Sequence, residues 1–275
     1  MYRLMADQLS DKVAIVTGSS SGLGEDIALL FAARGAKVTL CGRNEERLKS
    51  VFEQAVKVSG GHENRFLAVN GDLKDPKARK EVVARTIEKF GRLDILVANA
   101  GVISPLCNVS DATDESYNNI MDTNVKAVFF LIQEALPHIE KSRGNIITVS
   151  SMVSALVASP NLIYPMSKAA IDHLTRCLAV DLGPKGIRVN SVNPSFIPTL
   201  ILRSFDGDAD ESANEWARVE ETKQYLGHRL GTKKDVAEAV AFLASDAAGF
   251  VTGQHIKVDG GRSFGGPFGQ YNDIE

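Results

Sequence analysis

Seven short apolar runs alternate with longer segments of helical periodicity, and this alternation limits the possible folds more than any other feature. Several runs are apolar throughout, as expected for strands buried on both faces. The predicted strands are Lys12–Thr17, Lys37–Gly42, Arg65–Asn70, Asp94–Ala98, Asn145–Ser150, Arg188–Asn193 and His255–Asp259. The predicted helices are Gly24–Arg34, Glu45–Val58, Lys77–Phe90, Asp114–Lys141, Met166–Leu182 and Lys234–Ser245. Such alternation implies parallel strands joined by crossover helices. We predict a single α/β domain with a doubly wound, seven-stranded parallel sheet and helices on both faces.

The composition fits one globular core and excludes several classes of protein. Of 275 residues, 44% are hydrophobic, which is enough for one sizeable core. The 31 basic and 34 acidic side chains leave a net charge of −3, so we expect no nucleic-acid partner. No stretch approaches about 18 consecutive apolar residues, and the N-terminal MYRLMADQLSDK lacks the apolar region of a secretory signal. A cytoplasmic protein without a transmembrane segment is expected.

Cysteine and histidine do not indicate a disulfide scaffold or a metal site. Cys41, Cys107 and Cys177 are odd in number and far apart, unlike a disulfide framework. The five histidines are scattered without a His-Glu-x-x-His pair. We therefore expect no bound metal.

Two segments interrupt the alternation. The first, about 195–230, is acidic at Asp206–Glu211, and long insertions of this kind are often functional. We interpret it as a substrate loop that orders when ligands bind, with a permanently packed helical hairpin as the alternative. The Gly-rich tail after Asp259 fits either a frayed terminus or an oligomer contact.

A glycine-rich turn follows the first predicted strand and opens a helix. It reads Thr17-Gly18-Ser19-Ser20-Ser21-Gly22-Leu23-Gly24. Glycines let the backbone turn tightly and approach a pyrophosphate, while the helix N-terminus offers unpaired N–H groups. The turn lacks the Lys-Ser/Thr of a Walker A motif. Its place between strand and helix predicts a dinucleotide site.

The spacing Gly-x-x-x-Gly-x-Gly resembles that of the short-chain dehydrogenase/reductase family, and further motifs follow in that family's order. They are Asp72-Leu73, Ala98-Asn99-Ala100-Gly101, Asn124, Ser151, Tyr164-x-x-x-Lys168, Asn193-Pro194 and Asp259-Gly260-Gly261. The resemblance covers about residues 11–262. It implies one NAD(P)-binding Rossmann domain over residues 1–275 and hydride transfer between a nicotinamide and a carbonyl or secondary alcohol.

Four residues are expected to be catalytic. Tyr164 and Lys168 are four apart, so they lie on one helix face, and the ammonium and an oxidised nicotinamide would both favour the tyrosine phenolate. The resemblance implies that Lys168 also binds the nicotinamide ribose. It further implies that Ser151 orients the substrate oxygen and that Asn124 holds a water in a proton relay. Pro165 suits the first helical turn, which would put Tyr164 at the helix entry.

The end of the second strand determines which nicotinamide cofactor fits. An acidic residue there accepts hydrogen bonds from the ribose, whereas a basic residue neutralises the 2′-phosphate. Here Gly42 stands where NAD-preferring relatives carry Asp, and Arg43 follows. We therefore predict NADP, with NAD as the alternative. If Arg43 does not bind a phosphate, it would be a solvated arginine at the start of the helix, paired with Glu45 or Glu46.

The resemblance also implies a set of cofactor-binding residues along the chain. Asp72 would lie beside the adenine, unless it only forms a turn or caps a helix, and Leu73 would use its main chain. Asn99 would line the ribose and brace the sheet. Ser195 replaces the usual glycine after Pro194, while Ile197 would offer main-chain groups and Thr199 a hydroxyl. The full set is Gly18, Ser20, Ser21, Gly22, Leu23, Arg43, Asn44, Asp72, Leu73, Asn99, Ala100, Gly101, Tyr164, Lys168, Pro194, Ile197 and Thr199.

The expected substrate pocket is apolar. Its lining would include Ile103, Leu106, Val153, Leu156, Ile163 and Phe196, which suits a ketone, steroid, quinone or 3-oxoacyl substrate. A non-catalytic protein that senses its cofactor is the alternative from another class. The resemblance implies a dimer or tetramer, and apolar residues beyond one stripe on two helices fit burial on two sides. These residues are Phe129, Phe130, Ile132, Leu174 and Leu178. We expect a homotetramer, with a homodimer as the alternative.

Overall fold

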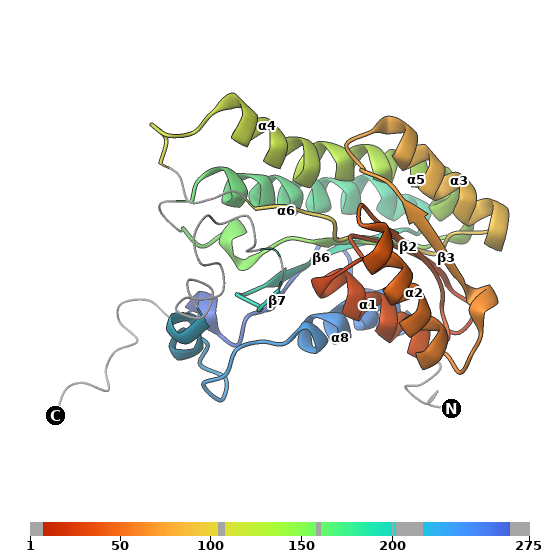
Figure 1. Cartoon of the computed structure of the whole chain (residues 1–275). Coiled ribbons are helices and arrows are strands. Elements are labelled where there is room, and N and C mark those ends of the chain that lie inside the picture. Colours follow the sequence, from red (N-terminus) through yellow and green to blue (C-terminus); the bar gives the residue numbers. More distant parts are fainter. Residues whose placement is uncertain (1–7, 104–107, 158–160, 200, 202–216, 265–275) are drawn as a thin grey trace.

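The computed structural model describes residues 8–103, 108–157, 161–199, 201 and 217–264, and its centre is a seven-stranded sheet (Figure 1). The strand order is β3-β2-β1-β4-β5-β6-β7, and all neighbouring strands are parallel. The strands are β1 (Val13–Thr17), β2 (Lys37–Gly42), β3 (Phe66–Asn70), β4 (Ile95–Ala98), β5 (Asn145–Val149), β6 (Arg188–Pro194) and β7 (His255–Val258). The predicted fold class is confirmed.

Helices cover both faces of the sheet, as predicted (Figure 1). One face carries α1 (Gly22–Ala33), α2 (Glu45–Val58) and α8 (Lys233–Ala244). The other carries α3 (Pro76–Phe90), α4 (Asp114–Met121), α5 (Ala127–Ser142) and α6 (Ile163–Leu182). Short 3₁₀ helices lie at Glu63–Arg65, Met152–Ser154, Gly183–Lys185, Asp246–Ala248 and Arg262–Phe264. Side-chain caps fix the starts of α2, α3, α4 and α8, and they are Asn44, Asp75, Thr113 and Thr232.

Two apolar layers hold the helices to the sheet. On one side Phe31 of α1 and Phe66 of β3 are completely buried. On the other, Leu131 of α5 and Ile171 of α6 pack against the opposite strand faces. Burial from both sides explains why β1, β2 and β4 are apolar without alternation.

The helix predicted over Asp114–Lys141 contains a π-helical turn, which the sequence did not reveal. Residues Asp122–Lys126 form this turn between α4 and α5. Within it, the side chain of Asn124 hydrogen-bonds to both main-chain groups of Val102. Single π turns frequently mark functional sites. Here the turn brings Asn124 to the carboxyl end of β4.

The strand order creates a crevice beside β1. The chain runs outward from β1 to β2 and β3 and then returns to β4 on the other side of β1. Loops at the carboxyl ends of β1 and β4 therefore diverge, which is where ligands bind in open α/β sheets.

The insertion at about 195–230 is partly fixed to the body of the protein. Residues 217–223 are helical, and Glu220 forms a largely buried ion pair with Arg262, with 2.9 Å between Oε2 and Nε. Gln224 Nε2 donates to the Phe196 carbonyl at 3.1 Å. These contacts hold residues 217–224 against the body of the protein, and the ordering of the segment on ligand binding stays a prediction. Residue 200, the acidic run within residues 202–216 and the tail after residue 264 lie outside the described residues.

Candidate active site

The turn between β1 and α1 has a backbone that allows a ligand to approach closely. Gly18 and Gly22 both have φ of +66°, in the left-handed region that favours glycine. A β-carbon on Gly24 would overlap the Gly18 carbonyl oxygen and lie 2.5 Å from Asn99 Nδ2. Within the described chain, the N-cap residue Ser21 gives the first turn of α1 no side-chain hydrogen bond. Main-chain N–H groups of that turn can therefore bind an anion such as pyrophosphate.

Side chains tie this turn to the neighbouring strand ends. Thr17 Oγ1 accepts hydrogen bonds from the main-chain N–H groups of Asn99 and Ala100, both at 3.0 Å. Asn99 Nδ2 in turn donates to the Thr17 carbonyl at 2.7 Å. Ser19 Oγ accepts from the N–H of Cys41 at 2.8 Å. Asn99 thus braces the sheet as predicted, while its contact with a ribose stays a prediction.

A cleft runs along the carboxyl ends of the strands, from the end of β2 to the start of α6. Most of the expected cofactor residues line it. Those lining it are Gly18, Ser20, Ser21, Gly22, Leu23, Arg43, Asn44, Asp72, Leu73, Asn99, Ala100, Gly101, Tyr164, Lys168 and Thr199. Pro194 and Ile197 do not line the cleft. Both are buried, and Ile197 lies against Gly231. Gly42, singled out above for cofactor choice, also lines the cleft. Lining residues that the sequence analysis missed are Cys41, Arg47, Gly71, Val102, Thr123, Val149, Ser150 and Ile201.

Arg43 pairs with Asp72 rather than with Glu45 or Glu46. Arg43 Nη1 lies 3.7 Å from Asp72 Oδ2, and the two side chains are 59% and 40% exposed. So exposed a pair contributes at most about 1 kcal/mol, and a phosphate could compete for the guanidinium. Asp72 also accepts a hydrogen bond from the N–H of Lys74 at 3.0 Å, so it does form a turn.

A second arginine lines the same end of the cleft. Arg47 lies in the first turn of α2, whose N-cap residue Asn44 accepts a hydrogen bond from the Arg47 N–H at 2.8 Å. The buried Arg47 Nε has no hydrogen-bond partner among the described residues. Arg47 is the third residue of a helix that starts at the end of β2, and this position could have indicated it from the sequence.

Tyr164 and Lys168 line the other end of the cleft, and Ser151, which is not part of the lining, lies next to Tyr164. Helix α6 begins at Ile163, so Tyr164 lies in its first turn and Pro165 removes no intrahelical hydrogen bond. The side chains of Ser151 and Tyr164 are hydrogen-bonded. Lys168 Nζ donates to the Val149 carbonyl at 2.9 Å and lies 5.5 Å from the centre of the Tyr164 ring.

Asn124 lies next to this group, but its amide is engaged by the protein itself. Its Oδ1 accepts from the Val102 N–H at 2.8 Å, and its Nδ2 donates to the Val102 carbonyl at 2.9 Å and to Ser167 Oγ at 3.1 Å. A β-carbon on Gly101 would lie 3.3 Å from Asn124 Oδ1 and 3.6 Å from Lys168 Nζ. The residue is therefore close to Lys168, and its water-holding role stays a prediction.

Burial moves the pKa values of Tyr164 and Lys168 in opposite directions. It raises the pKa of Tyr164 to about 12, although the hydrogen bond from Ser151 acts against it. It lowers the pKa of Lys168 to about 8, and the carboxylate of Asp172 opposes this shift. In the protein alone, desolvation penalises the phenolate more strongly than Ser151 favours it. The positive charge of an oxidised nicotinamide would favour the phenolate.

The expected substrate pocket is only partly described. Ile163 is buried, whereas the other described members are partly exposed, namely Ile103, Val153, Leu156 and Phe196. Leu106 lies outside the described residues.

Among the described residues, no helix combines the length and apolar character needed to cross a bilayer. In the same part of the chain, no three histidine, cysteine or acidic side chains gather where a metal ion could be held.

Comparison with known proteins identifies the family. A family model described as enoyl-(acyl carrier protein) reductase matches residues 18–263. Versicolorin reductase 1 from Aspergillus parasiticus is 37% identical over 262 residues, covering 92% of this chain and 97% of that protein. The chain belongs to the short-chain dehydrogenase/reductase family. As a family member, it is an oxidoreductase that acts on alcohol or ketone groups.

Solved structures of the short-chain dehydrogenase/reductase family share the fold. One from Caenorhabditis elegans, of unknown function and with cofactor, has a TM-score of 0.87 at 33% identity and covers 95% of this chain and 98% of its own. A 3-ketoacyl-(acyl-carrier-protein) reductase from Brucella melitensis complexed with NADH has a TM-score of 0.81 at 30% identity, with coverages of 92% and 99%.

The close contact around Gly24 leads to the first prediction. In Gly24→Ala the new methyl group must displace Gly18 or Asn99, so the free energy of unfolding should fall by about 1–3 kcal/mol. Cofactor binding, measured by fluorescence titration, should weaken at the same time. The control is Gly183→Ala, where a β-carbon meets no atom within 4 Å. Equal stability and cofactor affinity in the two variants would contradict the role of Gly24.

Proposed function

We propose that this protein is an NADP-dependent oxidoreductase that transfers a hydride between the nicotinamide and a carbonyl or secondary-alcohol substrate. The observation that carries the choice of cofactor is the pair of guanidinium groups at the end of β2. Arg43 and Arg47 both line the cleft beside Gly42. Arginine suits a 2′-phosphate because its planar fork donates two parallel hydrogen bonds.

The surroundings of Gly42 add support for NADP. A β-carbon at this position would lie 2.8 Å from Ser20 Oγ and 2.9 Å from Ser20 Cβ. A carboxylate side chain of the NAD-preferring type would therefore have to displace Ser20. Favouring NAD instead, Asp72 lies 3.7 Å from Arg43, where it would repel a phosphate. NAD remains the alternative cofactor.

The protein's own residues supply the binding and the proton transfer. A bound nicotinamide would donate or accept the hydride. Tyr164, protonated at neutral pH because burial raises its pKa to about 12, would donate its proton to the substrate oxygen during reduction. Ser151 would hydrogen-bond to the same oxygen. The ammonium of Lys168 would stabilise the resulting phenolate and bind the ribose, while Asn124 would hold the water that returns the proton.

The substrate class follows from the apolar residues around Ser151 and Tyr164. A ketone, steroid, quinone or 3-oxoacyl compound would suit the apolar chain neighbours of these residues, namely the partly exposed Val153 and Leu156 after Ser151 and the buried Ile163 before Tyr164. A non-catalytic cofactor sensor is the weaker alternative, because it would not need Ser151 hydrogen-bonded to Tyr164.

Replacement of the proton donor tests the proposed activity. Tyr164→Phe should lower kcat by about 10²–10⁴-fold, the usual contribution of one acid–base group, and leave NADPH binding intact. Turnover is followed by NADPH absorbance with a panel of ketones. Tyr117→Phe, at an exposed tyrosine on α4, is the matched control. Near-normal turnover in Tyr164→Phe would refute the assignment.

Replacement of Arg43 tests the cofactor choice. Arg43→Leu should raise the Kd for NADPH by about 10–100-fold, because a charge-assisted hydrogen bond contributes about 1.5–3 kcal/mol. The Kd for NADH should change little. The control Lys49→Leu removes an exposed cation from α2, the helix that follows Arg43. It should change the affinity for neither NADPH nor NADH. A wild-type protein that binds NADH more tightly than NADPH would make NAD the cofactor.

The proposal includes a homotetramer, with a homodimer as the alternative. Of the residues expected at the interface, Ile132 is buried in the core and Leu174 and Leu178 are partly buried against it. Phe129 and Phe130 of α5 are 45% and 37% exposed, and burial of these rings between subunits would stabilise an oligomer. Light scattering at micromolar concentration should give four or two times the chain mass. A monomeric mass would contradict both states.

A further inference from the structure

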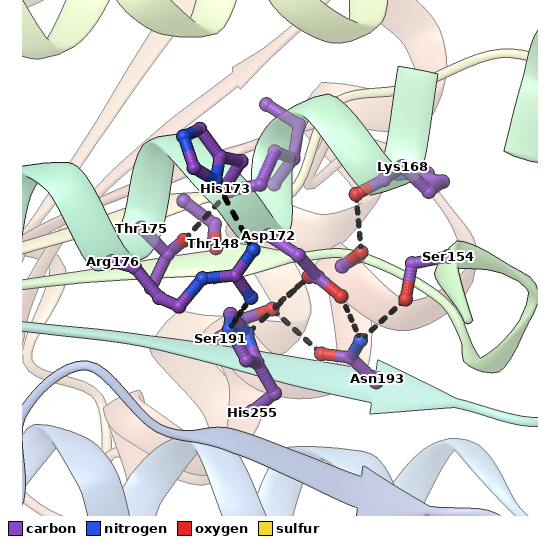
Figure 2. Close-up of polar contacts among 12 residues, drawn as sticks. Thr148, Ser154, Lys168, Asp172, His173, Thr175, Arg176, Ser191, Asn193 and His255 are labelled. Atoms are coloured by element: carbon purple, nitrogen blue, oxygen red, sulfur yellow. Dashed lines mark hydrogen bonds and ion pairs between the residues drawn. The ribbon is translucent and has the colours of Figure 1, made fainter. Parts of the chain in front are cut away.

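A buried carboxylate lies one helical turn after Lys168. Asp172 of α6 is 8% exposed, and its partners come from two neighbouring strands (Figure 2). Its Oδ2 accepts a hydrogen bond from Asn193 Nδ2 of β6 at 2.8 Å, and its Oδ1 lies 3.4 Å from Ser191 Oγ. A buried carboxylate is costly unless it is hydrogen-bonded, and the bonds to Asn193 and Ser191 offset this cost.

Asn193 links Asp172 to the turn that carries Ser151. Besides the Asp172 carboxylate, its Nδ2 lies 3.2 Å from the Ser151 carbonyl oxygen and 3.1 Å from Ser154 Oγ. The carboxylate and the carbonyl can only accept hydrogen bonds, so the amide nitrogen must face them. Ser191 Oγ donates to the opposite side of the amide, Oδ1, at 2.7 Å. Asn193 is therefore held in one orientation and fixes both ends of the turn from Ser151 to Ser154.

The outer side of Asp172 is closed by His255 of β7. Arg176 Nη1 lies 3.0 Å from His255 Nε2, and a guanidinium only donates, so Nε2 is the acceptor. The proton of neutral His255 then sits on Nδ1, which lies 3.4 Å from Asp172 Oδ1. Arg176 Nη2 also approaches His173 Nδ1 at 3.2 Å. Burial and Arg176 together hold the pKa of His255 below its usual value, although Asp172 acts in the opposite direction.

We propose that Asp172 is a positioning residue for the active site, acting through Asn193 on the turn that carries Ser151 and through its negative charge on Lys168. The proposal rests on the roles of Ser151, Tyr164 and Lys168 proposed above. Tyr164, Lys168 and Asp172 all belong to α6. The hydrogen bond that Asn193 donates to Asp172 therefore sets the distance between that helix and the Ser151 turn. Small errors in such distances cost about 100-fold in rate.

The charge of Asp172 has a separate consequence for Lys168. From its own helix, Lys168 is faced by Asp172 and Tyr164. From β5 it is faced by the Val149 carbonyl, and the uncharged side chain of Asn124 is nearby. A carboxylate raises the pKa of a neighbouring ammonium. Removing the charge in Asp172→Asn should therefore lower the pKa of Lys168 from its value of about 8, and the ammonium should be lost at a lower pH.

The first measurement separates positioning from simple stabilisation. Asp172→Leu, which removes both the charge and the acceptor for the Asn193 amide, should lower kcat for a ketone that the wild type reduces with NADPH by about 10–100-fold, with little change in KM. Asp172→Asn removes the charge but keeps an amide oxygen that can accept from Asn193. The exchange variant Asp172→Asn/Asn193→Asp restores an amide–carboxylate bond between α6 and β6. It supplies no amide N–H for the Ser151 carbonyl, so it should recover thermal stability but not kcat. Asp181→Asn, at an exposed position of the same helix, is the control and should retain wild-type kcat.

The second measurement needs neither cofactor nor substrate. The ¹⁵Nζ resonance of Lys168, assigned with Lys168→Arg, is titrated by NMR in the wild type, Asp172→Asn and Asp181→Asn. Only Asp172→Asn should show a lower midpoint. Recovery of kcat in the exchange variant, or an unchanged Lys168 midpoint in Asp172→Asn, overturns the proposal. If the wild type reduces no ketone with NADPH, the proposed function fails and the lysine titration still tests Asp172.

Discussion

The hydroxyl of Thr17 joins the end of β1 to the end of β4 at the cofactor cleft. It accepts the main-chain N–H groups of Asn99 and Ala100 and donates to the Val97 carbonyl at 3.3 Å. β1 and β4 are neighbours only because the strand order reverses beside β1, and this reversal opens the crevice. With Asn99 bonded back to the Thr17 carbonyl, the glycine-rich turn and the end of β4 form one rigid unit. The glycines of the turn and the loop after β4 are therefore held in place together.

Burial is the second constraint, and it determines the resting protonation of the site. Desolvation disfavours charged forms, so the pKa of Tyr164 rises and that of Lys168 falls. Each shift is opposed by one neighbour, Ser151 for the tyrosine and Asp172 for the lysine. In the protein alone, Tyr164 is therefore a neutral phenol, and Lys168 is an ammonium that loses its proton more readily than an exposed lysine does. A positive charge close to the tyrosine is what would stabilise its phenolate.

The sequence predicted the sheet and most of the cleft, and it failed where contacts join distant residues. Strand ends were predicted within one residue, because buried parallel strands are apolar throughout and end at polar or glycine-rich turns. The π-helical turn at Asp122–Lys126 was missed, because it accompanies hydrogen bonds between Asn124 and Val102. The bond between Glu220 and Arg262, which fixes half of the insertion, likewise has no local signal.

The amino-acid sequence by itself determined the order of the elements, the glycines at left-handed backbone positions and the helical spacing of Tyr164 and Lys168. These features depend on local sterics and on periodicity, which short stretches of sequence carry. Only the tertiary structure decided that Asp72 is the partner of Arg43, that Asn193 connects Asp172 to the Ser151 turn, and in which direction the pKa of Tyr164 shifts. Ion pairing, hydrogen bonding and desolvation depend on which residues meet after folding, and no local pattern encodes that.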